Sequence, residues 1–201
     1  MDKTVGDIRH AMIDDPRVKK EAEDKHIREV ISGALTEGKG FKLLSIGRAE
    51  GPGCYCLIND FLRYGIDSVV EAFDVIFIDC EAGPEQISRR IVQRTDVLAI
   101  IADNSMRSIQ AARVISKVAY EVAGKEFDTM GLVINRYAEK NEPIKEAAEQ
   151  LGLQIFGYIP EDENIDRYDL SGRPLLELPD SSPSIVAVQG ILTKMGLMDS
   201  N

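Results

Sequence analysis

The sequence predicts an α/β fold with a doubly wound, mostly parallel sheet. Five short apolar runs rich in β-branched residues alternate with stretches of helical periodicity, and this alternation is typical of the architecture. Most of the runs are continuously apolar, as expected for strands buried on both faces of a parallel sheet. The runs cover residues 41–46, 74–79, 97–102, 130–134 and 154–159.

Helical patterns lie between and around these runs. The stretch 84–94 opens with a proline, which is favoured at the first helical position. The stretch 105–123 carries apolar residues at steps of three and four, and 142–151 ends at Gly152, a normal helix stop. The run 184–195 is predicted to form a C-terminal helix. We expect one domain over residues 1–201, with a helical lead-in (1–40), a sheet core (41–160) and a C-terminal loop and helix (161–201).

Composition narrows the class of protein. The chain has 201 residues, is 44% hydrophobic and contains three cysteines, which fits one cored domain and not a secreted disulfide scaffold. A net charge of −10 argues against nucleic-acid binding, because that binding depends on Lys and Arg neutralising phosphates. No apolar run approaches the length of a membrane span. We therefore expect a cytoplasmic protein with no nucleic-acid partner and no membrane span.

The loop after the first apolar run contains Cys54 and Cys56 among three glycines and a proline. In extended backbone, residues i and i+2 project to the same side, so both sulfurs are able to reach one metal ion. A closed tetrahedral zinc site usually has four protein ligands, and a two-fold homodimer would supply four thiolates. The alternative is a pair of buried structural thiols.

Other candidate residues follow the later strands, where ligands sit in open α/β sheets. Asp79 ends an apolar run in the manner of a Walker B strand, whose carboxylate holds Mg²⁺, and Gly83 would let the backbone approach a phosphate. The Asn135 amide has the donor and acceptor needed to pair with adenine, and Pro160 opens a loop beside the base. Each residue also has an ordinary interpretation as a strand-end or turn residue.

A phosphate-binding loop is the expected element that we do not find. The motif G-x-x-x-x-G-K-[ST] should follow the first strand and open a helix, and the 201 residues contain no match. Without its amides and lysine, the β- and γ-phosphates lose most of their positioning. We therefore expect no ATP hydrolysis from this chain alone.

Several motifs together resemble the carbon monoxide dehydrogenase maturation ATPases, which are nickel-insertion accessory proteins. This family is similar to the MinD/ParA cell-division and plasmid-partition ATPases and to the nitrogenase iron protein. The resemblance covers nearly all of the chain and is carried by V-G-D-I-R at 5–9, G-R-A-E-G-P-G-C-Y-C at 47–56, I-D-C-E-A-G at 78–83 with S-R-R at 88–90, and V-I-N-R at 133–136.

The resemblance implies a deviant-Walker P-loop NTPase fold that lacks its first βαβ unit in this chain. It also implies ATP or ADP bound with Mg²⁺, and a homodimer that holds Ni²⁺ or Zn²⁺ between Cys54 and Cys56 of each subunit. Asp79 would be the Mg²⁺ carboxylate, Asn135 would read adenine, and carbon monoxide dehydrogenase or a related nickel enzyme would be the partner. The alternatives are a non-hydrolytic module that docks on a partner ATPase or metalloenzyme, and a truncated gene model of a normal ATPase.

Overall fold

The computed structural model describes residues 27–45, 70–84, 87, 95–123, 127–138 and 142–199. The chain divides into two compact units, an N-terminal unit of residues 1–80 with 89–93, and a C-terminal unit of residues 81–88 with 94–201. Each unit is described by itself. The single domain expected from the sequence stays a prediction.

The described part of the N-terminal unit contains a helix and a hairpin. Helix α3 (Ile27–Ala34) leads directly into β1 (Leu35–Glu37), which pairs antiparallel with β2 (Lys42–Leu44). The Gly38 N–H donates to the Phe41 carbonyl at 2.8 Å, and Gly40 closes the turn with a φ of 84°. The helical lead-in predicted over residues 1–40 is therefore wrong at β1, because the glycines at 38 and 40 allow the chain to fold back into a hairpin.

The apolar run at 74–79 is not a strand. After the short 3-10 helix η1 (Val70–Ala72), residues 73–80 belong to no sheet, and the Phe77 side chain is 70% exposed. The prediction of a strand here is wrong for this structure, because a strand forms only where its N–H and C=O groups hydrogen-bond to a neighbouring strand. An apolar sequence alone does not provide that partner.

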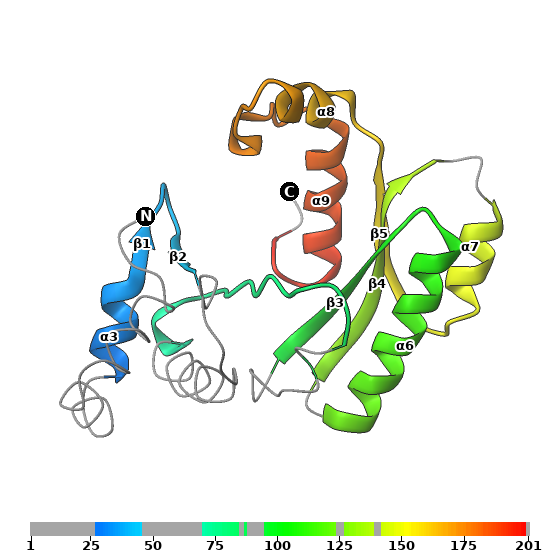
Figure 1. Cartoon of the computed structure of the whole chain (residues 1–201), viewed down its shortest axis with the longest axis horizontal. Coiled ribbons are helices and arrows are strands. Elements are labelled where there is room, and N and C mark those ends of the chain that lie inside the picture. The colour runs from blue at the N-terminus through cyan, green and yellow to red at the C-terminus, as the bar shows by residue number, and fades with distance from the viewer. Residues whose placement is uncertain are drawn as a thin grey trace, which may run out of the picture. The chain divides into compact units, whose positions relative to one another are not determined.

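The C-terminal unit is built on a three-stranded parallel sheet. The strands β3 (Thr95–Asp103), β4 (Phe127–Tyr137) and β5 (Gln154–Pro160) lie in the order β3-β4-β5 (Figure 1). The helices are α6 (Met106–Ala123), α7 (Glu142–Glu149), α8 (Glu163–Leu170) and α9 (Pro183–Lys194), with a 3-10 helix η2 (Leu175–Glu177). The last three predicted strands are confirmed as parallel neighbours.

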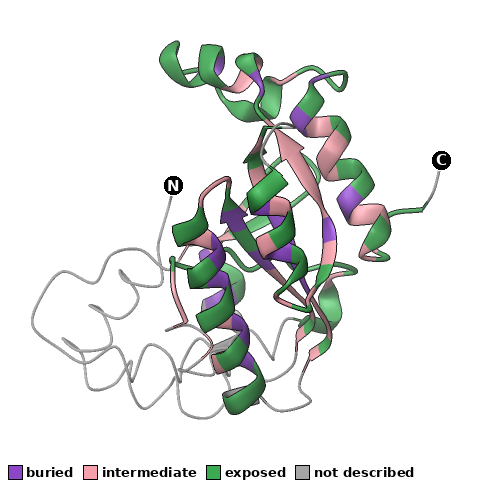
Figure 2. Ribbon diagram, turned by 90° about the vertical axis from the view of Figure 1, so that its right-hand side faces the viewer, coloured by how far each residue is buried: buried purple, intermediate pink, exposed green. Residues whose placement is uncertain are grey.

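Helices cover both faces of this sheet. On one face α6 and α7 pack against β3 and β4, and on the other α9 packs against β4 and β5 (Figures 1 and 2). In β4, Leu132 and Ile134 enter the first cluster and Val133 enters the second. Successive β4 residues are thus buried on opposite faces, which is why the sequence of this strand is continuously apolar. The doubly wound α/β fold is confirmed.

The helix boundaries follow from capping residues. Ser105 precedes α6, and its hydroxyl accepts a hydrogen bond from the Ser108 N–H at 3.2 Å, as an N-cap residue does. Gly152 follows α7 with a φ of 70°, as expected for a helix stop. The predicted helix at 84–94 lies mostly outside the described residues. No helix in the described ranges combines the length and apolar character needed to cross a membrane.

Candidate nucleotide site at the carboxyl ends of the strands

The sheet brings two of the predicted site residues to one edge. Asn135 lies near the end of β4, in register with Asp103 at the end of β3. Pro160 ends β5 and is in register with Tyr137 of β4. The three parallel strands therefore place Asn135 and Pro160 at their carboxyl ends, the edge where open α/β sheets bind ligands.

A β-bulge determines how Asn135 is presented. The pairing of β4 with β5 runs from Ile134↔Tyr158 to Tyr137↔Pro160, so β4 carries one more residue than β5 over this interval. Arg136 adopts a left-handed conformation with a φ of 54°, and its N–H donates to Oδ1 of Asn135 at 3.0 Å. Bulges of this kind redirect side chains at functional edges, and a left-handed residue other than glycine carries strain.

The Asn135 side chain remains suited to adenine in this arrangement. It is half-buried, and its carbonyl oxygen has a second lone pair beyond the one that accepts from Arg136. The amide NH₂ supplies the donor that adenine N7 requires, and the oxygen accepts from the N6 amino group. The donor and acceptor set of this residue thus fits the edge of an adenine base.

A shallow polar cavity of about 260 Å³ lies at the same edge. Its lining consists of Asp103, Asn104, Ser105, Arg136 and Glu161. The Ser105 hydroxyl donates to Asp103, and the Asp103 N–H donates to the Ser108 hydroxyl at 2.9 Å. The cavity thus combines the cation of Arg136 with two carboxylates and a helix start, a lining suited to polar ligand groups.

Two tyrosines lie near the carboxyl ends of β4 and β5. The rings of Tyr137 and Tyr158 have centroids 4.6 Å apart at an interplanar angle of 47°, and both side chains pack against the α6–α7 core. Burial raises the pKa of Tyr158, and the nearby Glu149 carboxylate raises it further. Tyr158 therefore remains a neutral packing residue at neutral pH.

Asp162 fixes the loop that follows Pro160. Its Oδ1 accepts from the Asn164 N–H at 2.9 Å and caps α8. Its Oδ2 accepts from the Ser182 hydroxyl and from the hydroxyl and N–H of Ser184 at the start of α9. Burial raises the pKa of Asp162, but the hydrogen bonds from Ser182, Ser184 and Asn164 outweigh it and hold the pKa well below its usual range.

The other predicted site residues are Asp79, Gly83, Cys54 and Cys56. Asp79 belongs to the N-terminal unit, and Gly83 lies in the C-terminal unit with a φ of 113° that favours glycine. Cys54 and Cys56 lie outside the described residues. Cys80 is exposed over part of its surface, and the partial burial of its thiol, together with the Asp79 charge, raises the pKa of that thiol. The described residues contain no group of three or more His, Cys, Asp or Glu side chains arranged to hold a metal ion.

Sequence reasoning missed several residues of this edge. It assigned no role in the site to Asp103 or to Asp162, whereas Asp103 lines the cavity, and Asp162 is buried and caps the start of α8. The signal for α8 is present in the sequence. Asp162 is followed by an acidic first turn, and Gly172 follows Ser171 as a stop. The sequence does not predict that Arg136 lines the cavity, because the bulge in β4 places it there.

Residues 4–189 match the family described as 4Fe-4S iron sulfur cluster binding proteins, NifH/frxC family. The chain belongs to the NifH/frxC family. The broad resemblance to this group of P-loop ATPases is thereby confirmed.

Among curated proteins, this chain is similar to an uncharacterized ATP-binding protein of Methanocaldococcus jannaschii. The two are 37% identical over 97% of this chain and 79% of the relative. A second uncharacterized ATP-binding protein of the same organism is 29% identical over 66% of this chain and 52% of its own length. The carbon monoxide dehydrogenase accessory protein CooC of Rhodospirillum rubrum is 31% identical over 72% of this chain. The chain spans about half the length of the last two, 52% and 54%.

Two of the solved structures with similar folds are cell-division proteins. The MinD cell division protein of Aquifex aeolicus has a TM-score of 0.65 and 16% identity, over 89% of this chain and 78% of that one. The cell division ATPase MinD of Pyrococcus furiosus has a TM-score of 0.59 and 19% identity, over 86% and 76%. These likenesses show that this NifH/frxC-family chain has a fold of the P-loop NTPase type.

Proposed function

We propose that this chain is an adenine-nucleotide-binding accessory protein for the maturation of a nickel enzyme of the carbon monoxide dehydrogenase type. The observation that carries the proposal is the bulge that presents Asn135 at the carboxyl end of β4, with Pro160 at the end of the neighbouring β5. The similarity to CooC of Rhodospirillum rubrum, a carbon monoxide dehydrogenase accessory protein, supports the choice of partner.

Nucleotide binding is the first part of the proposal. Asn135 would hydrogen-bond the adenine edge, and Pro160 would flank the base. The polar cavity lined by Asp103 and Arg136 offers charged groups to the rest of the nucleotide. Asp79 is assigned as the Mg²⁺ carboxylate on sequence grounds. Three relatives described as ATP-binding proteins support nucleotide as the ligand.

Metal transfer is the second part. Cys54 and Cys56, separated by one residue in a glycine-rich loop, would hold Ni²⁺ or Zn²⁺ as cargo together with their copies in a second subunit. Thiolates bind both metals, with tetrahedral sulfur sites favouring Zn²⁺ and square-planar sites Ni²⁺. Because the 201 residues contain no phosphate-loop motif, we propose that this chain binds nucleotide without turning it over.

Native mass spectrometry tests the metal part. The chain is measured with and without Ni²⁺ or Zn²⁺, and with and without MgATP. We expect a dimer that carries one metal ion and that loses the metal in the Cys54→Ser/Cys56→Ser variant. Cys80→Ser is the matched control, because it removes the third cysteine of the chain and should retain the metal. Full metal binding by the double variant would reject the thiolate site.

Isothermal titration with MgADP and MgATP tests the nucleotide part. Because a bidentate amide–base pair contributes about 1–3 kcal/mol, Asn135→Ala should weaken binding about tenfold to a hundredfold. Gln110→Ala removes an exposed amide on α6 and should leave the affinity unchanged. Equal affinity in both variants would reject Asn135 as the adenine reader, and robust ATP hydrolysis by the purified chain would reject binding without turnover.

A further inference from the structure

The C-terminal end of α8 exposes large apolar side chains. Leu170, the last residue of α8, is 90% exposed, and Leu176 and Leu175 of η2 are 84% and 50% exposed. A single exposed leucine is ordinary. Three within seven residues, at one helix end and the short helix after it, are a local concentration of exposed apolar side chains, which is a feature of interaction sites. We call these three leucines, with α8 and η2, the α8–η2 surface.

The backbone of this surface is firmly fixed. Gly172 has a φ of 65°, its N–H donates to the Asp169 carbonyl at 3.0 Å, and the Arg173 N–H donates to the Tyr168 carbonyl at 2.9 Å. These are the two hydrogen bonds of a Schellman motif. The Ser171 hydroxyl donates to the carbonyls of Arg167 and Tyr168. The end of α8 is thus closed by hydrogen bonds and is not frayed.

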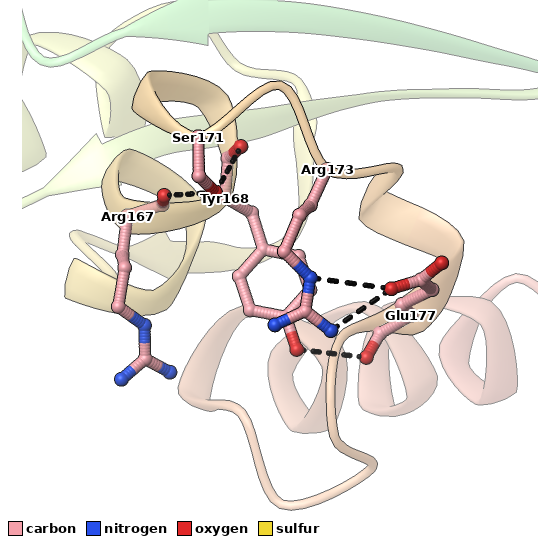
Figure 3. A network of polar contacts seen from close by, with 5 residues as sticks. All are labelled: Arg167, Tyr168, Ser171, Arg173 and Glu177. Atoms are coloured by element: carbon pink, nitrogen blue, oxygen red, sulfur yellow. Dashed lines mark hydrogen bonds and ion pairs between the residues drawn. The ribbon is translucent and has the colours of Figure 1, made fainter.

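Side chains join the end of α8 to η2. The Arg173 guanidinium lies over the Tyr168 ring, 4.3 Å from its centroid, and its Nη2 is 2.9 Å from a Glu177 carboxylate oxygen (Figure 3). The Tyr168 hydroxyl donates to the Glu177 carbonyl at 3.0 Å. In a Schellman motif an apolar contact usually links the two positions that Tyr168 and Arg173 occupy. Here the cation–π contact between these two side chains takes its place. The backbone that carries the leucines on either side of this link is therefore fixed, which lowers the entropic cost of ordering it on docking.

The charges around the leucines are mostly negative. Residues 161–180 contain seven acids and two arginines; of the acids, Asp162 is buried and Glu177 is paired with Arg173, which leaves five. Helical spacing places Glu163 and Asp166 on the same face of α8 as Leu170. The arginines are already engaged, Arg173 with Glu177 and Arg167 with the Asn164 side-chain oxygen at 2.8 Å. The apolar centre therefore has an acidic rim.

We propose that the α8–η2 surface docks a positively charged amphipathic segment of a partner protein. The partner's apolar side chains would cover Leu170, Leu175 and Leu176, and its lysines or arginines would face the acidic rim. The same charges disfavour other occupants. A second copy would bring an identical acidic rim against the first, and anionic lipid and nucleic acid would be repelled. This proposal does not depend on nucleotide or metal binding by the chain.

The test uses the full chain and a short synthetic helical peptide of leucine and lysine, labelled for fluorescence anisotropy. We expect Leu170→Ser/Leu176→Ser to weaken binding about tenfold or more, because each exposed leucine loses its burial in the complex. Val114→Ser/Val186→Ser is the matched control. It removes two exposed apolar side chains from α6 and α9, which are 55% and 54% exposed, and should leave the affinity unchanged. Equal weakening in both double variants, or none in either, would overturn the proposal.

Charge is tested in the same assay. Asp166→Asn/Asp169→Asn should weaken peptide binding several-fold and reduce its salt dependence, and Asp96→Asn/Asp199→Asn should do neither. A peptide with glutamate in place of lysine should not bind. Three results would overturn the proposal: concentration-dependent dimerisation that the leucine variant abolishes, tight binding of anionic vesicles, or tight binding of DNA at this surface.

Discussion

The carboxylate of Asp162 accepts hydrogen bonds from both the N–H and the hydroxyl of Ser184, at 3.0 Å and 2.7 Å, although the two residues are 22 positions apart. The same carboxylate caps α8 through the Asn164 N–H. One buried side chain therefore satisfies the starts of two helices. Because Asp162 follows Pro160 after one residue, it also fixes the loop that would flank the base.

Replacing Asp162 should be costly. Asp162→Ala leaves the N–H groups of Asn164 and Ser184 and two buried hydroxyls without their acceptor, so we expect the free energy of unfolding to fall by about 2–4 kcal/mol. Urea unfolding monitored by circular dichroism measures the change. Glu161→Ala, at the exposed neighbouring position, should change stability by less than about 0.5 kcal/mol. A loss at Asp162 no larger than at Glu161 would contradict the double-cap role.

The same carboxylate should make stability depend on acid pH. The folded-state pKa of Asp162 lies below its usual value, so its contribution is present in full above the unfolded pKa of about 3.9. It is lost as the pH falls from there toward the folded pKa, because the unfolded state then binds more protons. Urea unfolding between about pH 2.5 and 6 should show this loss in the wild type. The loss should be smaller in Asp162→Asn, and equal pH profiles would contradict the assignment.

The continuously apolar strands that pair with one another, β3, β4 and β5, were predictable from the sequence. β3, β4 and β5 are buried by helices on both faces, so their composition reports their environment directly. Residues 74–79 have the same composition, but the structure pairs them with no strand. Hydrophobic patterning identifies residues that can be buried, and pairing depends on neighbours that the local sequence does not encode.

The candidate site was predictable only in part, for a similar reason. Asn135 and Pro160 stand at strand ends, a position that the sequence indicates. The bulge at Asn135 and Arg136 depends on the register in which β4 pairs with β5. The local sequence V-I-N-R does not predict that register. The burial of Asp162 was not predictable, because charged residues are rarely buried and its partners at 182 and 184 are distant in sequence.

Close packing of the sheet predicts opposite effects for two glycines. A Cβ at Gly131 would lie 2.5 Å from the Phe156 ring and 2.6 Å from the Gln154 carbonyl oxygen. Gly131→Ala should therefore destabilise the chain by about 1–3 kcal/mol. Gly190, inside α9, has open space at its Cβ position, and Gly190→Ala should stabilise by about 0.5–1 kcal/mol. Thermal unfolding of both variants checks the pair, and a stabilising Gly131→Ala would contradict the close approach.

The effect of backbone strain at Arg136 on stability should be separable from the effect of its charge on nucleotide binding. Its φ of 54° costs a residue with a Cβ about 1 kcal/mol, so Arg136→Gly should be more stable than Arg136→Ala, which retains the strain. Both variants remove the cation that lines the cavity and should weaken MgADP binding to the same extent. Parallel urea unfolding and calorimetric titration distinguish the two effects. If Arg136→Gly binds MgADP as tightly as the wild type, the guanidinium takes no part in the nucleotide site. If the two variants are equally stable, the left-handed backbone carries no strain that glycine can relieve.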